Sequence, residues 1–181
     1  MVALGIEEEF LLIDNKALLP VAPTESQTKA LQQITAAGGV ASQEWLRCQI
    51  EHASAALTDA SSATAALLAF RQKLASVTQQ FSMAAVPVGA APSIEEYNAT
   101  ITDAARYMQL AELAPGIAAD QYINGMHVHV TIPDAETGVR ALNGLRPWLP
   151  LLTALSANSP FCMGEIQGLR VGGPFTIGAG W

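Results

Sequence analysis

Residues 4–13 read LGIEEEFLLI and carry three consecutive glutamates inside an otherwise apolar run. Side chains of a β-strand alternate between its two faces, so Glu7 and Glu9 share one face and Glu8 lies on the other. Two buried carboxylates on one face repel each other, and both burial and repulsion raise their pKa values. A bound cation relieves this repulsion, and oxygen ligands favour Mg²⁺, Mn²⁺ or Ca²⁺. The alternative is a solvated edge strand with a polar face.

Composition limits the class of protein. The chain has 181 residues, of which 50% are hydrophobic and 14% charged, with a net charge of -7. This size fits one domain, and the negative charge argues against a nucleic-acid partner. Two cysteines make no disulfide framework, which favours a reducing cytoplasm. No signal peptide is apparent at the N-terminus, and prolines interrupt the apolar run at 145–161, so we expect no membrane association.

Hydrophobic periodicity predicts an α+β fold with an antiparallel sheet. The expected strands cover residues 2–13, 45–52, 83–88 and 123–132. The expected helices cover residues 25–37, 63–81, 103–114 and 134–143, with a further helix reaching residue 156. Along the second helix, the predicted packing stripe is Leu67, Leu68, Phe70, Leu74 and Val77. Residues 172–181 are rich in glycine without periodicity, and we expect them to be irregular.

Two further strands present groups that bind metals. Glu51 lies on the polar face of the segment 45–52, and His127 and His129 alternate with valines in the segment 123–132. If the strands are neighbours, these side chains line one polar basin suited to metals and phosphates. Each group also has an ordinary explanation, as an exposed carboxylate or as half-exposed polar residues on a sheet face.

Six segments taken in order resemble one known family, the carboxylate–amine ligases or type 2 glutamate–cysteine ligases. They are LGIEEEFLLID (4–14), EWLRCQIE (44–51), Arg106-Tyr107, GMHVHV (125–130), LRPWLP (145–150) and ALSANSPF (154–161). The resemblance implies a fold like that of glutamine synthetase, with a curved antiparallel sheet and helices packed on one face. It also implies ATP-dependent joining of the γ-carboxylate of glutamate to the amine of cysteine, or of another amine, through an acyl phosphate.

The resemblance further implies roles for individual residues. The expected Mg²⁺ ligands are Glu7, Glu9, Glu51 and His127; the expected ATP contacts are His127 and His129; the expected catalytic residues are Arg106 and His129. The partners would be small molecules, and the sequence leaves a homo-oligomer open.

Members of the family extend well beyond this length, and residues 169–181 depart from their pattern. We therefore expect a single truncated catalytic domain over residues 1–181 with an atypical tail. A catalytically inactive fragment that binds metal or a partner chain is the main alternative, and a Zn²⁺-dependent hydrolase built on His and Glu is a weaker one.

Overall fold

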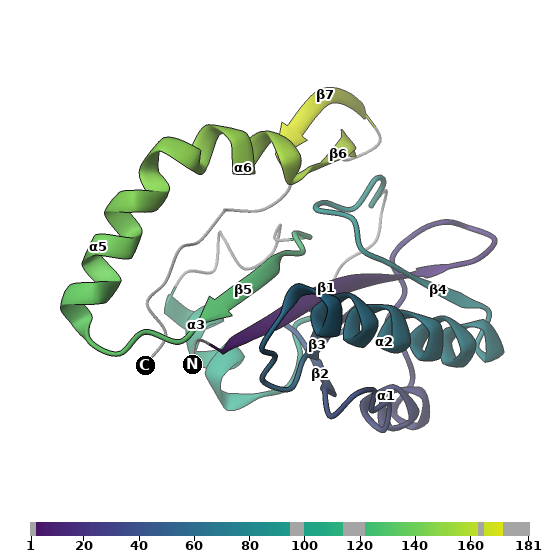
Figure 1. Ribbon diagram of the computed structural model, residues 1–181. Coiled ribbons are helices and arrows are strands. Elements are labelled where there is room, and N and C mark those ends of the chain that lie inside the picture. Colours follow the sequence, from purple (N-terminus) through teal and green to yellow (C-terminus); the bar gives the residue numbers. More distant parts are fainter. Residues whose placement is uncertain (1–2, 95–99, 114–121, 163–164, 172–181) are drawn as a thin grey trace.

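The computed structural model describes residues 3–94, 100–113, 122–162 and 165–171 (Figure 1). Its strands are β1 (Leu4–Asp14), β2 (Val40–Gln43), β3 (Gln49–Ala53), β4 (Met83–Val86), β5 (Met126–Val130), β6 (Ala157–Cys162) and β7 (Glu165–Val171). Its helices are α1 (Glu25–Gln32), α2 (Ala60–Gln80), α3 (Ala105–Leu113), α5 (Ala135–Leu145) and α6 (Leu149–Leu155), with a 3₁₀ turn η1 (Arg146–Trp148) before α6.

The strand β1 is the centre of an antiparallel sheet. The sheet has the order β2-β3-β1-β4, and β5 also pairs with β1. On one side β1 pairs with β3, so that Glu9 lies opposite Glu51. On its other side β1 pairs with β5 along its first half, where Glu7 lies opposite His127, and with β4 along its second half. The predicted antiparallel α+β fold is confirmed, and among the residues that the structure describes the sheet does not close on itself.

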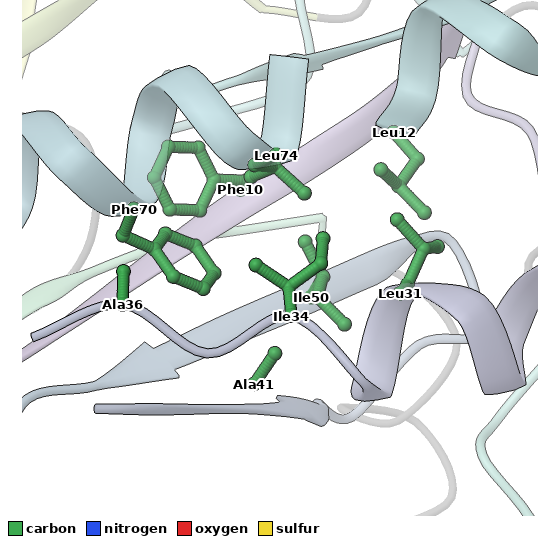
Figure 2. Packing of buried hydrophobic residues seen from close by; sticks show 9 residues of the cluster. All are labelled: Phe10, Leu12, Leu31, Ile34, Ala36, Ala41, Ile50, Phe70 and Leu74. Atoms are coloured by element: carbon green, nitrogen blue, oxygen red, sulfur yellow. The ribbon is translucent and has the colours of Figure 1, made fainter. Parts of the chain in front are cut away.

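Two helices cover one face of this sheet. Alternate residues of β1 and β3 contribute Phe10, Leu12 and Ile50 to a core shared with Leu31 of α1 and with Phe70 and Leu74 of α2 (Figure 2). The ring of Phe70 packs against Phe10 and stacks on His52 at a centroid distance of 3.9 Å. The predicted stripe of α2 is wrong in part, because Leu68 is exposed and the small Ala63 and Ala66 face the core instead.

Local hydrogen bonds explain where elements end. Asp59 caps α2, accepting from the backbone N–H of Ser62, and Thr24 forms a capping box with Gln27 at α1. The helix α1 ends at Gln32, earlier than predicted, and a turn follows in which Ala37 and Gly38 have positive φ.

The predicted strand at 45–52 is wrong in its first half. Its true start is Gln49, whose buried side-chain oxygen accepts from the backbone N–H of Leu46 at 2.9 Å and so closes a turn. That turn returns the chain from β2, a strand that the sequence pattern did not predict.

The segment after β5 leaves the sheet. Asp134 caps α5 as predicted, and the prolines of η1 and α6 divide the helices, but neither α5 nor α6 contains a buried residue. They form an arm above β5 that ends in the hairpin of β6 and β7, which was not predicted (Figure 1). Val128 and Val130, which alternate with the histidines along β5, are both exposed. The irregular tail predicted at 172–181 lies outside the described residues.

Gly39 closes against the sheet and gives a first test of the fold. A Cβ at Gly39 would lie 2.5 Å from Nε2 of His52 and 2.8 Å from the carbonyl oxygen of Ala53. We expect Gly39→Ala to lower the free energy of unfolding by about 2 kcal/mol. The added methyl group would overlap a backbone carbonyl oxygen, and relieving this overlap requires the backbone itself to shift. A Cβ at Gly144 meets no atom within 4 Å. The matched variant Gly144→Ala, in helix α5, should therefore not lower stability, since alanine is the better helix former. Equal denaturation midpoints for both variants would contradict this packing.

Candidate functional site

The first group of the site joins β1 to β5. One carboxylate oxygen of Glu7 lies 3.2 Å from Nδ1 of His127 and 2.8 Å from Nε2 of His129. The antiparallel register brings this about, because Glu7 pairs with His127 and Gly5 with His129. One donor atom from each of the three side chains lies within 4.8 Å of the others. A cation bound by this cluster would replace the hydrogen bonds between the imidazole rings and Glu7 with bonds from each side chain to the metal.

The second group consists of carboxylates beside the first. Glu9 and Glu51 face each other across β1 and β3, and Glu9 accepts a hydrogen bond from the backbone N–H of Gly125 at 2.8 Å. Glu51 accepts from the hydroxyl of Ser42 on β2 at 3.3 Å. Glu44, in the turn between β2 and β3, is close enough to affect both carboxylates. These carboxylates therefore form an acidic patch next to the cluster of Glu7 and the histidines.

The electrostatics of the two groups differ. Burial raises the pKa of Glu7, but hydrogen bonds from His129 and His127 outweigh burial, so its pKa lies below the ordinary value. Burial and repulsion from Glu44 and Glu51 raise the pKa of Glu9 to about 7, against a weaker lowering by Gly125 and His127. Burial, Glu44 and Glu7 likewise raise the pKa of Glu51. The hydrogen bonds and the imidazole near Glu9 and Glu51 therefore do not offset the effects of burial and of the neighbouring carboxylates on their negative charges.

A third group borders the acidic patch from α3. The hydroxyl of Tyr107 donates to Glu44 at 2.9 Å, and the guanidinium of Arg106 lies over the Tyr107 ring, 4.3 Å from its centroid. Arg106 also contacts the Tyr107 hydroxyl and lies 3.8 Å from Glu44. Burial and the bond to Glu44 raise the pKa of Tyr107 to about 12, so its hydroxyl stays protonated. Arg106 is a largely exposed cation at the rim of a negative patch.

Glu8 lies on the opposite face, as the alternation of β1 predicts. It is buried beneath α2 and forms a two-pronged ion pair with Arg71, whose Nε lies 3.0 Å from one carboxylate oxygen. This partner was not identified from the sequence. The arginine compensates Glu8, whereas no lysine or arginine contact is found for Glu7, Glu9 or Glu51 within the described ranges. Glu8 therefore has a structural role on one face of β1, and the candidate ligands Glu7 and Glu9 lie on the other face.

The structure brings together most of the residues that the sequence singled out. Glu7, His127 and His129 form one cluster, Glu9 and Glu51 lie beside it, and Arg106 stands at the edge. Glu44 was missed as a site residue. Its signal was present, since it opens the quoted segment 44–51, but the segment was interpreted as a strand rather than a turn that folds back onto β3. The roles of all these residues stay predictions.

The donor atoms fit a divalent cation. Glu9, Glu44 and Glu51 offer oxygen atoms only, the ligand type of Mg²⁺ and Mn²⁺. The raised pKa values of Glu9 and Glu51 mark charge that a cation would neutralise. The group of Glu7, His127 and His129 mixes oxygen with nitrogen, which suits Mn²⁺ or Zn²⁺ better than Mg²⁺. Two neighbouring positions of different character are therefore available on one sheet face.

The candidate site therefore lies on one face of an antiparallel sheet whose other face is covered by helices, and its side chains are of the types that ligate cations in proteins. A family model described as glutamate-cysteine ligase family 2 (GCS2) matches residues 3–170. The chain belongs to this family.

Named relatives support the same assignment. "Putative glutamate--cysteine ligase 2-1" of Nocardia farcinica is 36% identical over 165 residues, which cover 91% of this chain and 42% of the relative. "Putative glutamate--cysteine ligase 2" of Salinispora arenicola is 34% identical over 169 residues, covering 91% of this chain and 43% of the relative. The chain thus spans less than half the length of the curated relatives it matches.

One further feature concerns the helices. Among those in the described ranges, none combines the length and the apolar character needed to cross a membrane.

Proposed function

We propose that this chain supplies the metal-binding sheet of an ATP-dependent carboxylate–amine ligase that joins the γ-carboxylate of glutamate to the amine of cysteine. The observation that carries the proposal is a set of half-buried carboxylates with raised pKa values on one sheet face, beside an imidazole pair. Divalent cations would neutralise the charge of these carboxylates. A nucleoside triphosphate binds to enzymes together with such cations, which bridge its phosphate oxygens. Family membership connects this chemistry with amide-bond formation.

Each residue of the site would have a separate role in binding metal, nucleotide or substrate. Glu7, Glu9, Glu51 and His127 would hold Mg²⁺, and Glu44 would join them from its turn. The bound metal would neutralise charge on the phosphate oxygens during transfer. His127 and His129 would contact the nucleotide, with His129 donating its proton to a phosphate oxygen. Arg106 has an exposed guanidinium that would contact a phosphate or a substrate carboxylate.

The reaction would proceed in two balanced steps. The γ-carboxylate of glutamate attacks the terminal phosphorus of ATP, which forms an acyl phosphate and releases ADP. The amine of cysteine then attacks the acyl carbon, loses its proton and expels phosphate. The sheet would serve the first step by holding the phosphates and the carboxylate together.

An ADP-release assay on the full 181-residue chain tests the proposal. Release that requires Mg²⁺, glutamate and cysteine together is the expected result, and replacing cysteine by other amines identifies the second substrate. Glu9→Gln should abolish ADP release. Glu8→Gln, on the same strand but the other face, should retain the activity per mole of folded protein. Mg²⁺ binding without ADP release under any amino acid would contradict the ligase proposal and favour the inactive metal-binding fragment.

A second function has one observation in its favour. The triad of Glu7, His127 and His129 offers one carboxylate and two imidazoles, which is a common donor set for Zn²⁺ in hydrolases. This alternative predicts hydrolysis of an ester or amide with Zn²⁺ and without ATP. The same protein sample distinguishes the two, because only the ligase consumes ATP.

A further inference from the structure

The segment that precedes α3 is fastened to the turn that carries Glu44. The N–H of Thr102 donates to the carbonyl oxygen of Trp45 at 2.9 Å, and the hydroxyl of Thr102 donates to the carbonyl oxygen of Glu44 at 2.5 Å. An antiparallel bridge between Leu46 and Ile101 continues this pairing. Contacts to the main chain of the turn therefore place the start of α3 beside it, without any part played by the carboxylate of Glu44.

Tyr107, in the first turn of α3, reaches the same turn with its side chain. Its ring is buried and meets the indole of Trp45 edge to face at a centroid distance of 5.5 Å. The guanidinium of Arg106 covers the ring and contacts its hydroxyl. The hydroxyl donates to Oε2 of Glu44 at 2.9 Å. Because packing holds the ring, the hydroxyl offers its hydrogen from a fixed position.

The carboxylate of Glu44 lies among like charges. It is close enough to raise the pKa values of Glu9 and Glu51 by repulsion. A long, flexible side chain in a turn gains conformational freedom and escapes such repulsion by rotating into solvent. The side chain of Glu44 is nevertheless only 20% exposed. The hydrogen bond from Tyr107 therefore acts against the repulsion and keeps this carboxylate at the acidic patch.

We propose that Tyr107 is a positioning residue of the cation site and acts through Glu44, an inference that rests on the proposed Mg²⁺ site. An ionised carboxylate accepts several bonds, so Glu44 can accept from Tyr107 and ligate a cation at the same time. Groups that orient a metal ligand without touching the metal strengthen binding by about 10- to 100-fold. A phenol suits this role because it donates without carrying charge, whereas a cationic donor in its place would repel the bound metal.

Calorimetric titration of the full chain with Mg²⁺ tests the proposal. Tyr107→Phe removes the hydroxyl and keeps the ring that packs on Trp45, and we expect it to weaken Mg²⁺ binding by about tenfold. The matched control Ser61→Ala removes another hydroxyl that donates to a carboxylate, that of Asp59 at the start of α2. It should leave the Mg²⁺ affinity unchanged. Circular dichroism and melting of each variant show that it remains folded.

The variant Glu44→Gln and its combination with Tyr107→Phe show whether Tyr107 acts through Glu44. Independent effects add, whereas a residue that acts through another has no further effect once that residue is changed. We expect the double variant to bind Mg²⁺ as weakly as Glu44→Gln alone.

Two results would overturn the positioning role and leave the cation site intact. One is a Tyr107→Phe variant that melts at a lower temperature but binds Mg²⁺ like wild type, as a purely structural hydroxyl would produce. The other is a double variant whose loss of affinity is the full sum of the two single losses. Absence of Mg²⁺ binding by wild type would overturn the cation site itself, and the positioning role with it.

Discussion

Glu9→Gln is expected to remove most of the stabilisation that Mg²⁺ gives to the protein. At a Mg²⁺ concentration of one hundred times the wild-type Kd, binding stabilises the native state by about 2.7 kcal/mol. Loss of one carboxylate ligand that weakens binding by about 100-fold leaves about 0.4 kcal/mol. Thermal melts with and without Mg²⁺ measure this difference directly.

The metal-free protein should respond in the opposite direction. The pKa of Glu9 is raised from 4.5 to about 7, so its stabilising contribution is complete below pH 4.5 and is lost as the pH rises through 7. At pH 8 the ionised side chain is partly buried and repelled by Glu44 and Glu51. Glu9→Gln removes that repulsion, and we expect metal-free Glu9→Gln to melt at a higher temperature than wild type at pH 8 and not at pH 4.5.

Glu8→Gln is the matched control, because it makes the same chemical change one residue away on the other face of β1. It should lower the melting temperature with and without Mg²⁺ and keep the Mg²⁺-induced shift. An equal loss of that shift in both variants would mean that the cation site lies elsewhere.

Arg71→Leu is expected to destabilise the protein by about 3 kcal/mol. Removing the arginine leaves the carboxylate of Glu8 buried under α2 without its ion-pair partner. Breaking a buried pair in this way costs more than the pair contributes, and the half-exposed guanidinium places the effect at the lower end of the known range. Urea denaturation at pH 7.5 provides the measurement.

The double variant Glu8→Leu/Arg71→Leu distinguishes a lost pair from lost packing. Replacing both partners by apolar side chains removes the uncompensated charge, and we expect it to recover most of the stability. Lysine at position 71 is an intermediate case, because it keeps the charge and loses the two-pronged geometry. A double variant as unstable as Arg71→Leu would contradict the assignment of the effect to Glu8.

Alternation along β1 was sufficient to predict the two faces of the sheet. Glu7 and Glu9 lie on one side and Glu8 on the other because a strand of period two leaves no other arrangement. The N-caps at Thr24, Asp59 and Asp134 follow from local side-chain chemistry that acts within three residues. These features are determined by residues close to one another in the sequence, so they can be predicted from the sequence alone.

Features that depend on distant segments were not predictable in the same way. The turn that carries Glu44 exists because Gln49 bonds to Leu46 and because residues 100–102 pair with residues 45–47. The ion pair of Glu8 needs Arg71, 63 positions away. The apolar residues of β5 follow the pattern of a core strand, yet they are exposed, since periodicity shows that a face is apolar and not what covers it.

The central claim, a divalent-cation site at the acidic face, is tested most directly by calorimetric titration of the full chain with Mg²⁺ at pH 7 in two buffers of different ionisation enthalpy. With the pKa of Glu9 at about 7, binding should release roughly half a proton from that carboxylate at pH 7 and almost none at pH 9. Glu9→Gln should bind more weakly and lose this contribution, while Glu8→Gln should behave as wild type. No saturable binding by wild type, or the same proton release from Glu9→Gln as from wild type, would contradict the account.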